Sequence, residues 1–334
     1  MNKPPRKSYI KYSTKVNFSY PVGQYSFQIG RLGIEDSYIT GTLHLQFNQD
    51  EPLFAKKIIL KFIGNENVSW TERRTNSAAN KREHTASVTY SANNVLCCLT
   101  TCLLETSNDS YQKILNMDFP FKFKLPENIP SSLNAGAGNV DYMLIAEISR
   151  KRNILKFQKS KKRVSCYCNI LKYYLLPPPI PIYWVEYDTK KAIELNGLGY
   201  DIRMDGENFG PSNPIIVYAK LKLYNPKLKI KEIFVGLKKY CSFKAEGNTN
   251  SVKGYVLNER VVGDTITWDN YNEYYCVFTL NVPEDLTRIG QKFKHKLVFV
   301  TYKIKMKIKK VGIFNKNINL EHNVRIDRFL PVDY

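Results

Sequence analysis

The sequence predicts an all-β protein made of two antiparallel β-sandwich domains in tandem. Short stretches of alternating apolar and polar residues recur along the 334 residues, whereas helical periodicity is nearly absent. The length suits two domains of ordinary size, and 43% apolar residues are enough to form two cores. A cluster of prolines near the midpoint of the chain marks the expected boundary between them.

The proline-rich stretch at residues 175–184, LLPPPIPIYW, holds four prolines. Each proline fixes φ and lacks the N–H that an inner strand or a helix interior requires. Residues 177–184 are therefore predicted to form a stiff, extended linker. The resulting division is a basic flexible N-terminal arm, two sandwiches and a short C-terminal segment, at residues 1–20, 21–176, 185–312 and 313–334. The alternative is a proline-rich surface loop within one larger domain.

Basic residues exceed acidic residues throughout the chain. Lys plus Arg number 50 and Asp plus Glu number 30, which gives a formal net charge of +20. The excess is spread over both halves, with 25 basic and 13 acidic residues in 1–176, and 25 and 17 in 177–334. A charge of this size favours anionic partners such as phosphorylated peptides, acidic lipid headgroups or nucleic acid, without choosing among them.

The seven cysteines do not form a disulfide or metal framework. Five of them fall in two groups, and neither these nor the four scattered histidines have the paired spacing of a zinc site. The first fifteen residues are basic but lack the apolar region of a secretory signal, and no apolar run is long enough to span a membrane. We therefore expect buried, reduced thiols in a cytoplasmic protein, with no metal and no cofactor.

In the first half, the residue pattern predicts strands at 38–47, 58–63, 68–71, 95–104, 118–125 and 140–148. The stretch at 118–125, DFPFKFKL, shows the alternation clearly, with phenylalanines on one face and lysines on the other. The polar segment 73–94 has no apolar period, so it is predicted to be a long exposed loop or a hairpin tip.

The last part of this half, residues 154–168, is strongly basic. Lys161, Lys162 and Arg163 together are candidates for holding a phosphate group. The other interpretation is a solvated pair of strands that carries its lysines outward.

Four motifs of the first half occur in a familiar order. They are DSYITG at 36–41, LKFIG at 60–64 with a tryptophan shortly after, FPFKFKLPENIPSS at 119–132, and GNVDYMLIA at 138–146. In this order they resemble the N-terminal arrestin domain.

In the second half, alternation predicts strands at residues 198–204, 215–223, 274–282 and 297–310. Between the second and third of these, the apolar parity that ends at Ile230 resumes one residue out of step at Ile233. A parity change inside one strand predicts a β-bulge near Lys231 and Glu232.

The strand at 297–310 is the most regular in the chain. Its apolar residues are predicted to face inward: Val298, Val300, Tyr302, Ile304, Met306 and Ile308. Its lysines then form an outward row: Lys303, Lys305, Lys307 and Lys309. A second outward set lies on a predicted hairpin: Lys220, Lys222, Lys229 and Lys231. If the two sets share a face, a bound anion would relieve their mutual repulsion. The other interpretation is that the lysine row guards an edge strand.

The second half also carries a resemblance. The motifs are YDIRM at 200–204, FGP at 209–211 followed by IIV at 215–217, a Val-Pro stop at 282–283 and VTYKIKM at 300–306. They resemble the C-terminal arrestin domain. The two resemblances and the proline linker cover roughly residues 21–312. No single motif is specific, but their order across two domains is.

The arrestin resemblance implies two Ig-like β-sandwiches and a non-catalytic adaptor. Such an adaptor would work in the cytoplasm, peripherally at the plasma membrane or endosomes, in endocytic trafficking or signalling. Its partners would be cytoplasmic tails of membrane receptors or transporters, often phosphorylated, together with ubiquitin ligase or coat machinery. Acidic phospholipid headgroups would be further anionic partners.

The sequence departs from the family pattern in two respects. The PPxY motifs of α-arrestin tails, which recruit ubiquitin ligases, have only near matches here, at residues 179–183 and 330–334. The buried charged cluster of the visual and β-arrestins has no clear counterpart. The nearest candidate, Arg325 with Asp327, is expected to be a surface charge pair.

Catalytic motifs of the common kinds are missing from the sequence, which has no GxSxG, GxxxxGK[ST] or HExxH. We therefore expect no enzyme. Two alternatives to the trafficking adaptor remain. One is a coat component of the same fold, like the arrestin-shaped subunit of retromer. The other is a basic β-protein that binds nucleic acid, which would need aromatic residues interleaved with lysines on one exposed face.

Overall fold

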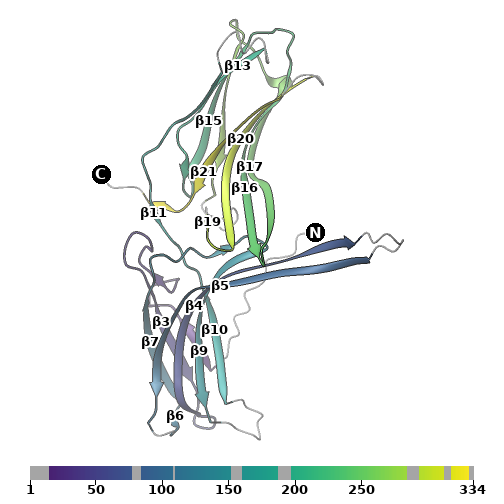
Figure 1. Ribbon diagram of the computed structural model, residues 1–334. Coiled ribbons are helices and arrows are strands. Elements are labelled where there is room, and N and C mark those ends of the chain that lie inside the picture. Colours follow the sequence, from purple (N-terminus) through teal and green to yellow (C-terminus); the bar gives the residue numbers. More distant parts are fainter. Residues whose placement is uncertain are drawn as a thin grey trace. The chain divides into compact units, whose positions relative to one another are not determined.

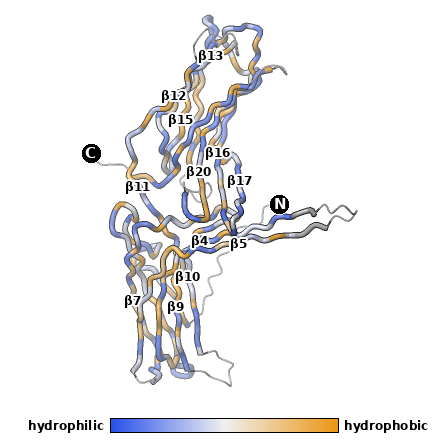
Figure 2. The backbone as a smooth tube through the Cα atoms, viewed as in Figure 1, coloured by the Kyte–Doolittle hydropathy of each residue, from blue (hydrophilic) through white to orange (hydrophobic). Residues whose placement is uncertain are grey.

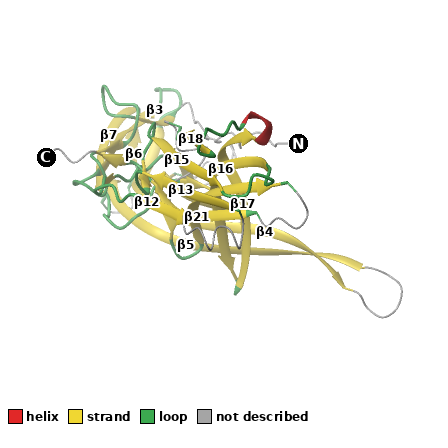
Figure 3. Cartoon of the chain, turned by 90° about the horizontal axis from the view of Figure 1, so that it is seen from above, coloured by secondary structure: helices red, strands yellow, loops and turns green. Residues whose placement is uncertain are grey.

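The structure is a computed structural model of the chain that describes residues 15–76, 84–107, 110–151, 160–186, 197–283, 293–311 and 317–330. These residues form 22 β-strands and one short 3-10 turn, and Figure 3 shows how strongly strands dominate. The chain divides into two compact units, Met1–Tyr173 and Tyr174–Tyr334 (Figure 1). The predicted all-β class is confirmed.

The N-terminal unit is built from two antiparallel sheets. The first contains β1 (Val16–Ser19), β2 (Gln28–Ile29), β3 (Tyr38–Gln46) and β7 (Asn116–Lys124) in the order β1-β3-β2, with β7 also paired to β3. The second has the order β10-β9-β4-β5, formed by β10 (Lys161–Cys168), β9 (Gly138–Arg150), β4 (Leu53–Asn76) and β5 (His84–Glu105). The short strands β6 (Gln112–Ile114) and β8 (Leu133–Asn134) extend it.

Aromatic rings from both sheets form the centre of this core. Phe62 stacks on Tyr142 within the second sheet, with ring centroids 5.7 Å apart, and meets Phe123 of the first sheet at 6.5 Å. Gly64 leaves room for the Tyr142 ring, because a Cβ at this position would lie 2.5 Å from a ring carbon. The Tyr142 hydroxyl donates a hydrogen bond of 2.7 Å to the carbonyl of Pro130, which satisfies its polar end inside the core.

Two expectations for the N-terminal unit need correction. Val16–Ser19 pairs with β3, so the predicted flexible arm is wrong over these residues, while residues 1–14 lie outside the described part. For the segment 73–94 the interpretation as a long loop is wrong and the hairpin interpretation is confirmed, because β4 and β5 form one long hairpin that extends past the rest of its sheet (Figures 1 and 3). Beyond Val68, β4 pairs only with β5. Near the base of this extension, Trp70 and Tyr90 are buried with their ring centroids 5.4 Å apart, and the residues beyond them pair through the main chain without an apolar period.

The C-terminal unit is also built from two sheets. The first has the order β12-β13-β15-β18, with β12 (Ile182–Glu186), β13 (Leu198–Met204), β15 (Pro214–Leu223) and β18 (Glu273–Asn281). The second has the order β14-β21-β20-β16-β17, with β14 (Asn208–Phe209), β21 (Ile318–Ile326), β20 (Val298–Lys310), β16 (Ile230–Ala245) and β17 (Asn248–Val262). Short elements complete the unit: β19 (Phe293–Lys294) beside β20, β11 (Tyr174–Leu175) paired in parallel with β22 (Phe329–Leu330), and the 3-10 turn η1 (Gly263–Thr265).

The strand pattern predicted for β20 is confirmed. All six residues predicted to face inward are 0–1% exposed, and the lysines between them are half-buried. Figure 2 shows the same alternation of hydrophobic and hydrophilic positions along the strands. The predicted bulge is also confirmed, because the register between β16 and β20 shifts between Ile230 and Glu232.

Three predictions for the C-terminal unit are wrong because they concern pairing rather than local pattern. β20 lies between β16 and β21, so its lysines do not guard an edge. β15 and β16 belong to different sheets and do not form a hairpin. The bounds also move: β12 begins at Ile182, inside the predicted linker, and the nine residues of β21 place part of the predicted C-terminal segment in the sheet.

Candidate functional site

The lysine row of β20 belongs to a larger basic surface on the second sheet of the C-terminal unit. Lys303 lies opposite Lys238 of β16, and Lys307 lies opposite Phe234, which in turn faces Arg260 of β17. The lysines of β20 alternate with buried residues, and Arg260 shares a register position with Phe234 and Lys307, so these side chains leave the same side of the sheet. We call this surface the cationic face and define it by Lys238, Arg260, Lys303, Lys305, Lys307 and Lys309.

Two carboxylates compensate part of this charge. Glu321 of β21 pairs with Lys303 at 2.6 Å and with Lys305 at 2.5 Å, and Glu232 pairs with Lys309 at 3.2 Å. The hydrogen bonds from Lys303 and Lys305 lower the pKa of Glu321 to about 2. The face therefore carries six cations against two carboxylates.

Three of the six cations have no carboxylate within ion-pair distance in the described part of the chain. Lys307 and Arg260 have no salt bridge there, and Lys238 contacts only the rings of Tyr240 and Tyr255, at 5.5 and 5.2 Å from their centroids. Lys238 also lies directly opposite Lys303 on the neighbouring strand. Like charges in this position destabilise a sheet, so a bound anion would relieve the repulsion.

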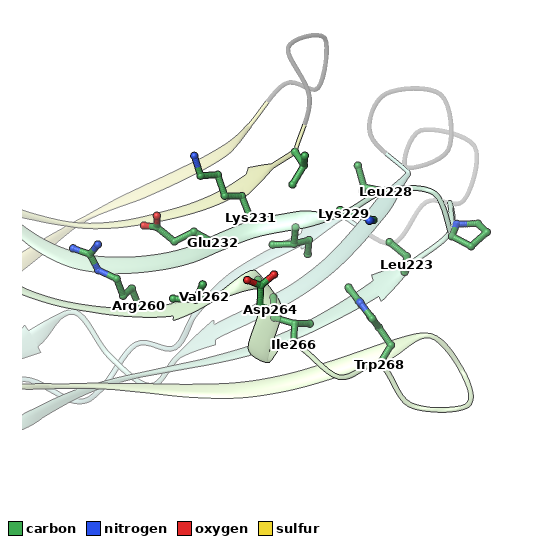
Figure 4. A pocket seen from close by; sticks show the side chains of 14 residues that line it. Leu223, Leu228, Lys229, Lys231, Glu232, Arg260, Val262, Asp264, Ile266 and Trp268 are labelled. Atoms are coloured by element: carbon green, nitrogen blue, oxygen red, sulfur yellow. The ribbon is translucent and has the colours of Figure 1, made fainter.

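A pocket of about 640 Å³ lies where β16 begins and β17 ends (Figure 4). Its apolar lining includes Leu223, Leu228, Ile230, Val262, Trp268 and Val311. Charged residues surround this lining: Lys229, Lys231, Glu232, Arg260 and Asp264. Arg260 belongs to both the pocket and the cationic face, so we treat them as one site and call the hollow the end pocket.

Local sequence explains the walls of the end pocket. The bulge makes Lys231 the extra residue of β16, which takes its side chain out of the regular alternation of the strand. On the other wall, the chain leaves β17 through η1, where a Cβ on Gly263 would lie 1.9 Å from the carbonyl oxygen of Ile230. Only glycine allows the two backbones to approach this closely.

The loop that carries Trp268 is held by its own hydrogen bonds. The Asp269 carboxylate accepts hydrogen bonds from the backbone N–H groups of Tyr271 (2.9 Å) and Glu273 (2.7 Å), which closes the turn before β18. The Trp268 ring lies 6.2 Å from the Tyr274 ring. The wall of the pocket is therefore formed before any partner arrives.

Lys220 and Lys222 lie elsewhere. They project from β15, in the first sheet of this unit, and both pair with Glu273, at 2.9 and 3.3 Å. Hydrogen bonds from Lys220 and then Tyr275 lower the pKa of Glu273 to about 2. Because the outer faces of two packed sheets point in opposite directions, these lysines do not share a face with the β20 row. The expectation that the two sets act together is wrong for Lys220 and Lys222.

The three basic candidates of the N-terminal unit lie on β10, an edge strand paired only with β9. Lys161 and Arg163 are exposed on one side of the strand. Lys162 points to the other side, with its ammonium 5.9 Å from the centre of the Phe47 ring, and burial lowers its pKa. The alternation therefore separates Lys162 from the other two, and the three do not form one cluster.

Two comparisons with known proteins bear on the family. Residues 32–173 match the model of the arrestin (or S-antigen) N-terminal domain, and residues 196–328 match that of the arrestin (or S-antigen) C-terminal domain. The chain belongs to the arrestin family. No curated protein matches it in sequence. Arrestins are in general non-catalytic adaptors that bind membrane receptors and trafficking machinery. In the part of this arrestin that the structure describes, no helix is long and apolar enough to cross a membrane.

The Arg325–Asp327 pair of this arrestin is not the surface pair that was expected. The Asp327 side chain is 2% exposed and accepts a hydrogen bond from Arg325 Nε. The Arg325 guanidinium lies 4.3 Å from the centre of the Tyr174 ring and 5.2 Å from that of Phe329. The strand pairing of β11 with β22 brings Tyr174 here from about 150 residues away in sequence, which no local pattern reveals.

A serine, a histidine and an aspartate form a hydrogen-bonded chain on the first sheet of the N-terminal unit. Ser19 Oγ lies 2.8 Å from His44 Nε2, and His44 Nδ1 lies 2.7 Å from Asp118 Oδ1. This is the order of a nucleophilic triad, but the Asp118 side chain is 67% exposed. In a triad the aspartate is buried, so that it fixes and stabilises the histidine. We therefore interpret these three hydrogen-bonded side chains as linking neighbouring strands on the surface of the sheet.

The cysteines differ in part from the expectation of burial. Within the described ranges, no group of three His, Cys, Asp or Glu side chains could hold a metal ion. All seven cysteines are free, and Cys97, Cys168 and Cys241 are buried. Cys98 and Cys102 are exposed on β5, so the expectation of burial is wrong for these two.

Three members of the site were missed from the sequence. Lys238 and Arg260 sit on strands whose partners were not predicted, and Trp268 sits in a loop. The parity of Glu232 and Phe234 would have placed Lys238 on the outer side of β16. No local sequence pattern indicates that Arg260 and Lys231 line the same pocket, because this depends on the pairing of β16 with β17.

Proposed function

We propose that this arrestin-family protein is an adaptor that binds acidic or phosphorylated cytoplasmic segments of membrane proteins through the cationic face. The observation that carries the proposal is the charge imbalance of that face, with six cations against two carboxylates. Phosphate and carboxylate groups suit such a surface, because charge-assisted hydrogen bonds are roughly twice as strong as neutral ones. Half-buried lysine stems also restrict the ammonium groups before binding.

The finer role in the cell is part of the proposal. We place the protein among the α-arrestin type of trafficking adaptors, in the cytoplasm and peripherally at the plasma membrane or endosomes. Ubiquitin ligase or coat machinery would then be recruited by surfaces other than the cationic face. The basic excess of both halves supports an approach to anionic headgroups as well as anionic peptides.

The sharpest test reverses two of the three cations that have no carboxylate within ion-pair distance in the described part of the chain. Binding of a phosphoserine peptide to the full chain, measured by fluorescence anisotropy at 0.15 M salt, should weaken at least tenfold in the Arg260→Glu, Lys307→Glu variant. Two lost charge-assisted contacts account for this change. The matched control is Lys113→Glu, Lys151→Glu, which makes the same change in net charge at exposed positions of the N-terminal unit. Equal loss in both variants would mean that only net charge matters and would reject the face as a site.

A second candidate function has one observation in its favour. The outer surface of β12-β13-β15-β18 carries Tyr183, Tyr218 and Tyr275 beside Arg203 and Lys220, with Arg203 4.7 Å from the Tyr218 ring centre. Interleaved aromatic and basic side chains are typical of protein surfaces that bind single-stranded nucleic acid. Both cations, however, already pair with Asp205 and Glu273. Filter binding of single-stranded RNA across a salt series separates the two functions, because nucleic-acid binding would show a steep salt dependence.

A further inference from the structure

The end pocket has an apolar interior that the cationic face does not explain. Leu223, Leu228 and Ile230 form its floor and are only 8–9% exposed. Val262 and Val311 form its sides and are 51% and 49% exposed. An exposed pair of aliphatic side chains next to a recessed apolar floor is typical of a site that receives an apolar group.

The surroundings of the pocket decide the charge of its partner. Lys229, Lys231 and Arg260 form no ion pair in the described part of the chain, and all three are exposed. Of the two carboxylates beside them, Glu232 is already paired with Lys309 at 3.2 Å. The rim therefore has a net positive charge, and it joins the cationic face through Arg260 (Figure 4).

From these two features we infer that the end pocket binds a large apolar side chain of the same acidic segment that lies on the cationic face. The inference rests on the proposed function and adds the chemical class of the partner: an acidic or phosphorylated peptide with an aliphatic or aromatic anchor residue. The pocket volume of about 640 Å³ is large enough for such a side chain with part of its backbone. The bulge at Lys231 then serves to turn that lysine toward the acidic residues beside the anchor.

Trp268 supplies a direct reporter of occupancy. The chain has three tryptophans, and replacing Trp70 and Trp184 with phenylalanine leaves the one that lines the pocket. The probes are acidic phosphoserine dodecapeptides in which one leucine is moved through the sequence, with an alanine parent. A leucine at the correct position should tighten binding about 10- to 100-fold, which corresponds to burying one such side chain. The same peptide, and not its parent, should shift the Trp268 emission.

A pocket variant gives a second measurement that needs no tryptophan replacement. Val262→Asp places a carboxylate on the exposed wall and should abolish the ratio of affinities between the leucine peptide and the alanine parent, although the added charge weakens the binding of both peptides. The control is Val252→Asp, which changes an equally exposed valine of the same strand outside the pocket. Peptides that carry a fluorescent label report both affinities by anisotropy.

Each outcome is decisive. If both peptides bind with one affinity and Trp268 does not respond, the inference is wrong and the proposed function stands. If neither peptide binds, both are wrong. If vesicles of phosphatidylserine shift the Trp268 emission and the leucine peptides do not, the pocket serves a lipid surface and the inference is overturned.

Discussion

Replacing Arg325 with methionine should destabilise the C-terminal unit. The substitution keeps an apolar stem against Tyr174 and Phe329 but removes the cation that contacts the Asp327 carboxylate. Asp327 is 2% exposed, so its charge would be left inside the unit without this partner. Breaking a fully buried pair in this way costs about 3–5 kcal/mol of the free energy of unfolding.

The expected magnitude is lower here because the Arg325 side chain is 33% exposed and its half of the pair is partly solvated. We expect a loss of about 2–4 kcal/mol, which lowers the Tm of a unit of this size by roughly 4–16 °C. The assay is thermal and urea unfolding of the full chain. Fluorescence reports the C-terminal unit, because Trp184 and Trp268 belong to it and only Trp70 belongs to the other.

The double variant Arg325→Met, Asp327→Asn is the control for this reasoning. Removing the second charge should restore about half or more of the loss, because the cost comes from a buried carboxylate that has lost its ion pair with Arg325. An Arg325→Met protein as stable as the parent would refute the argument, and so would a double variant no more stable than the single one.

Three further predictions concern other parts of the molecule. Gly64→Ala should cost about 1–3 kcal/mol in urea unfolding, because the new methyl group would overlap the Tyr142 ring. Glu321→Gln should strengthen binding of the acidic peptide several-fold at low salt and little at 1 M salt, since it removes one carboxylate from the cationic face. Hydrogen bonds from Lys303 and Lys305 lower the pKa of Glu321 to about 2. The peptide affinity of the parent protein should therefore approach that of the variant only as the pH falls from about 4.5 toward 2. Ser19 should not react with a fluorophosphonate probe, because the carboxylate behind its histidine is mostly exposed, and labelling that disappears in Ser19→Ala would contradict this.

The local features of this arrestin were predictable from sequence to a large extent. The alternation of β20 placed its inward residues correctly, because side chains of a strand alternate with a strict period of two. The change of parity after Ile230 placed the bulge correctly for the same reason. The motifs that resemble the two arrestin domains all lie within the ranges that the family models match.

The candidate site was predictable only in part. Lys303, Lys305, Lys307 and Lys309 were found because one strand carries them all. The prediction that they share a face with Lys220 and Lys222 was wrong, because β15 and β16, which follow each other in sequence, belong to different sheets. For residues 73–94 the hairpin interpretation was correct and the alternative of a long loop was wrong, since main-chain pairing in a long hairpin needs no apolar pattern.

The sequence by itself determined which residues of each strand point inward, where one strand bulges, and which family the two halves belong to. These properties depend on neighbours along the chain. Only the tertiary structure decided that Arg260 joins the lysines of β20, that Lys229 and Lys231 surround an apolar pocket, and that Asp327 is buried. Each of these depends on which distant strands pair, and the free energy of that choice comes from the packing of whole sheets rather than from any single stretch of residues.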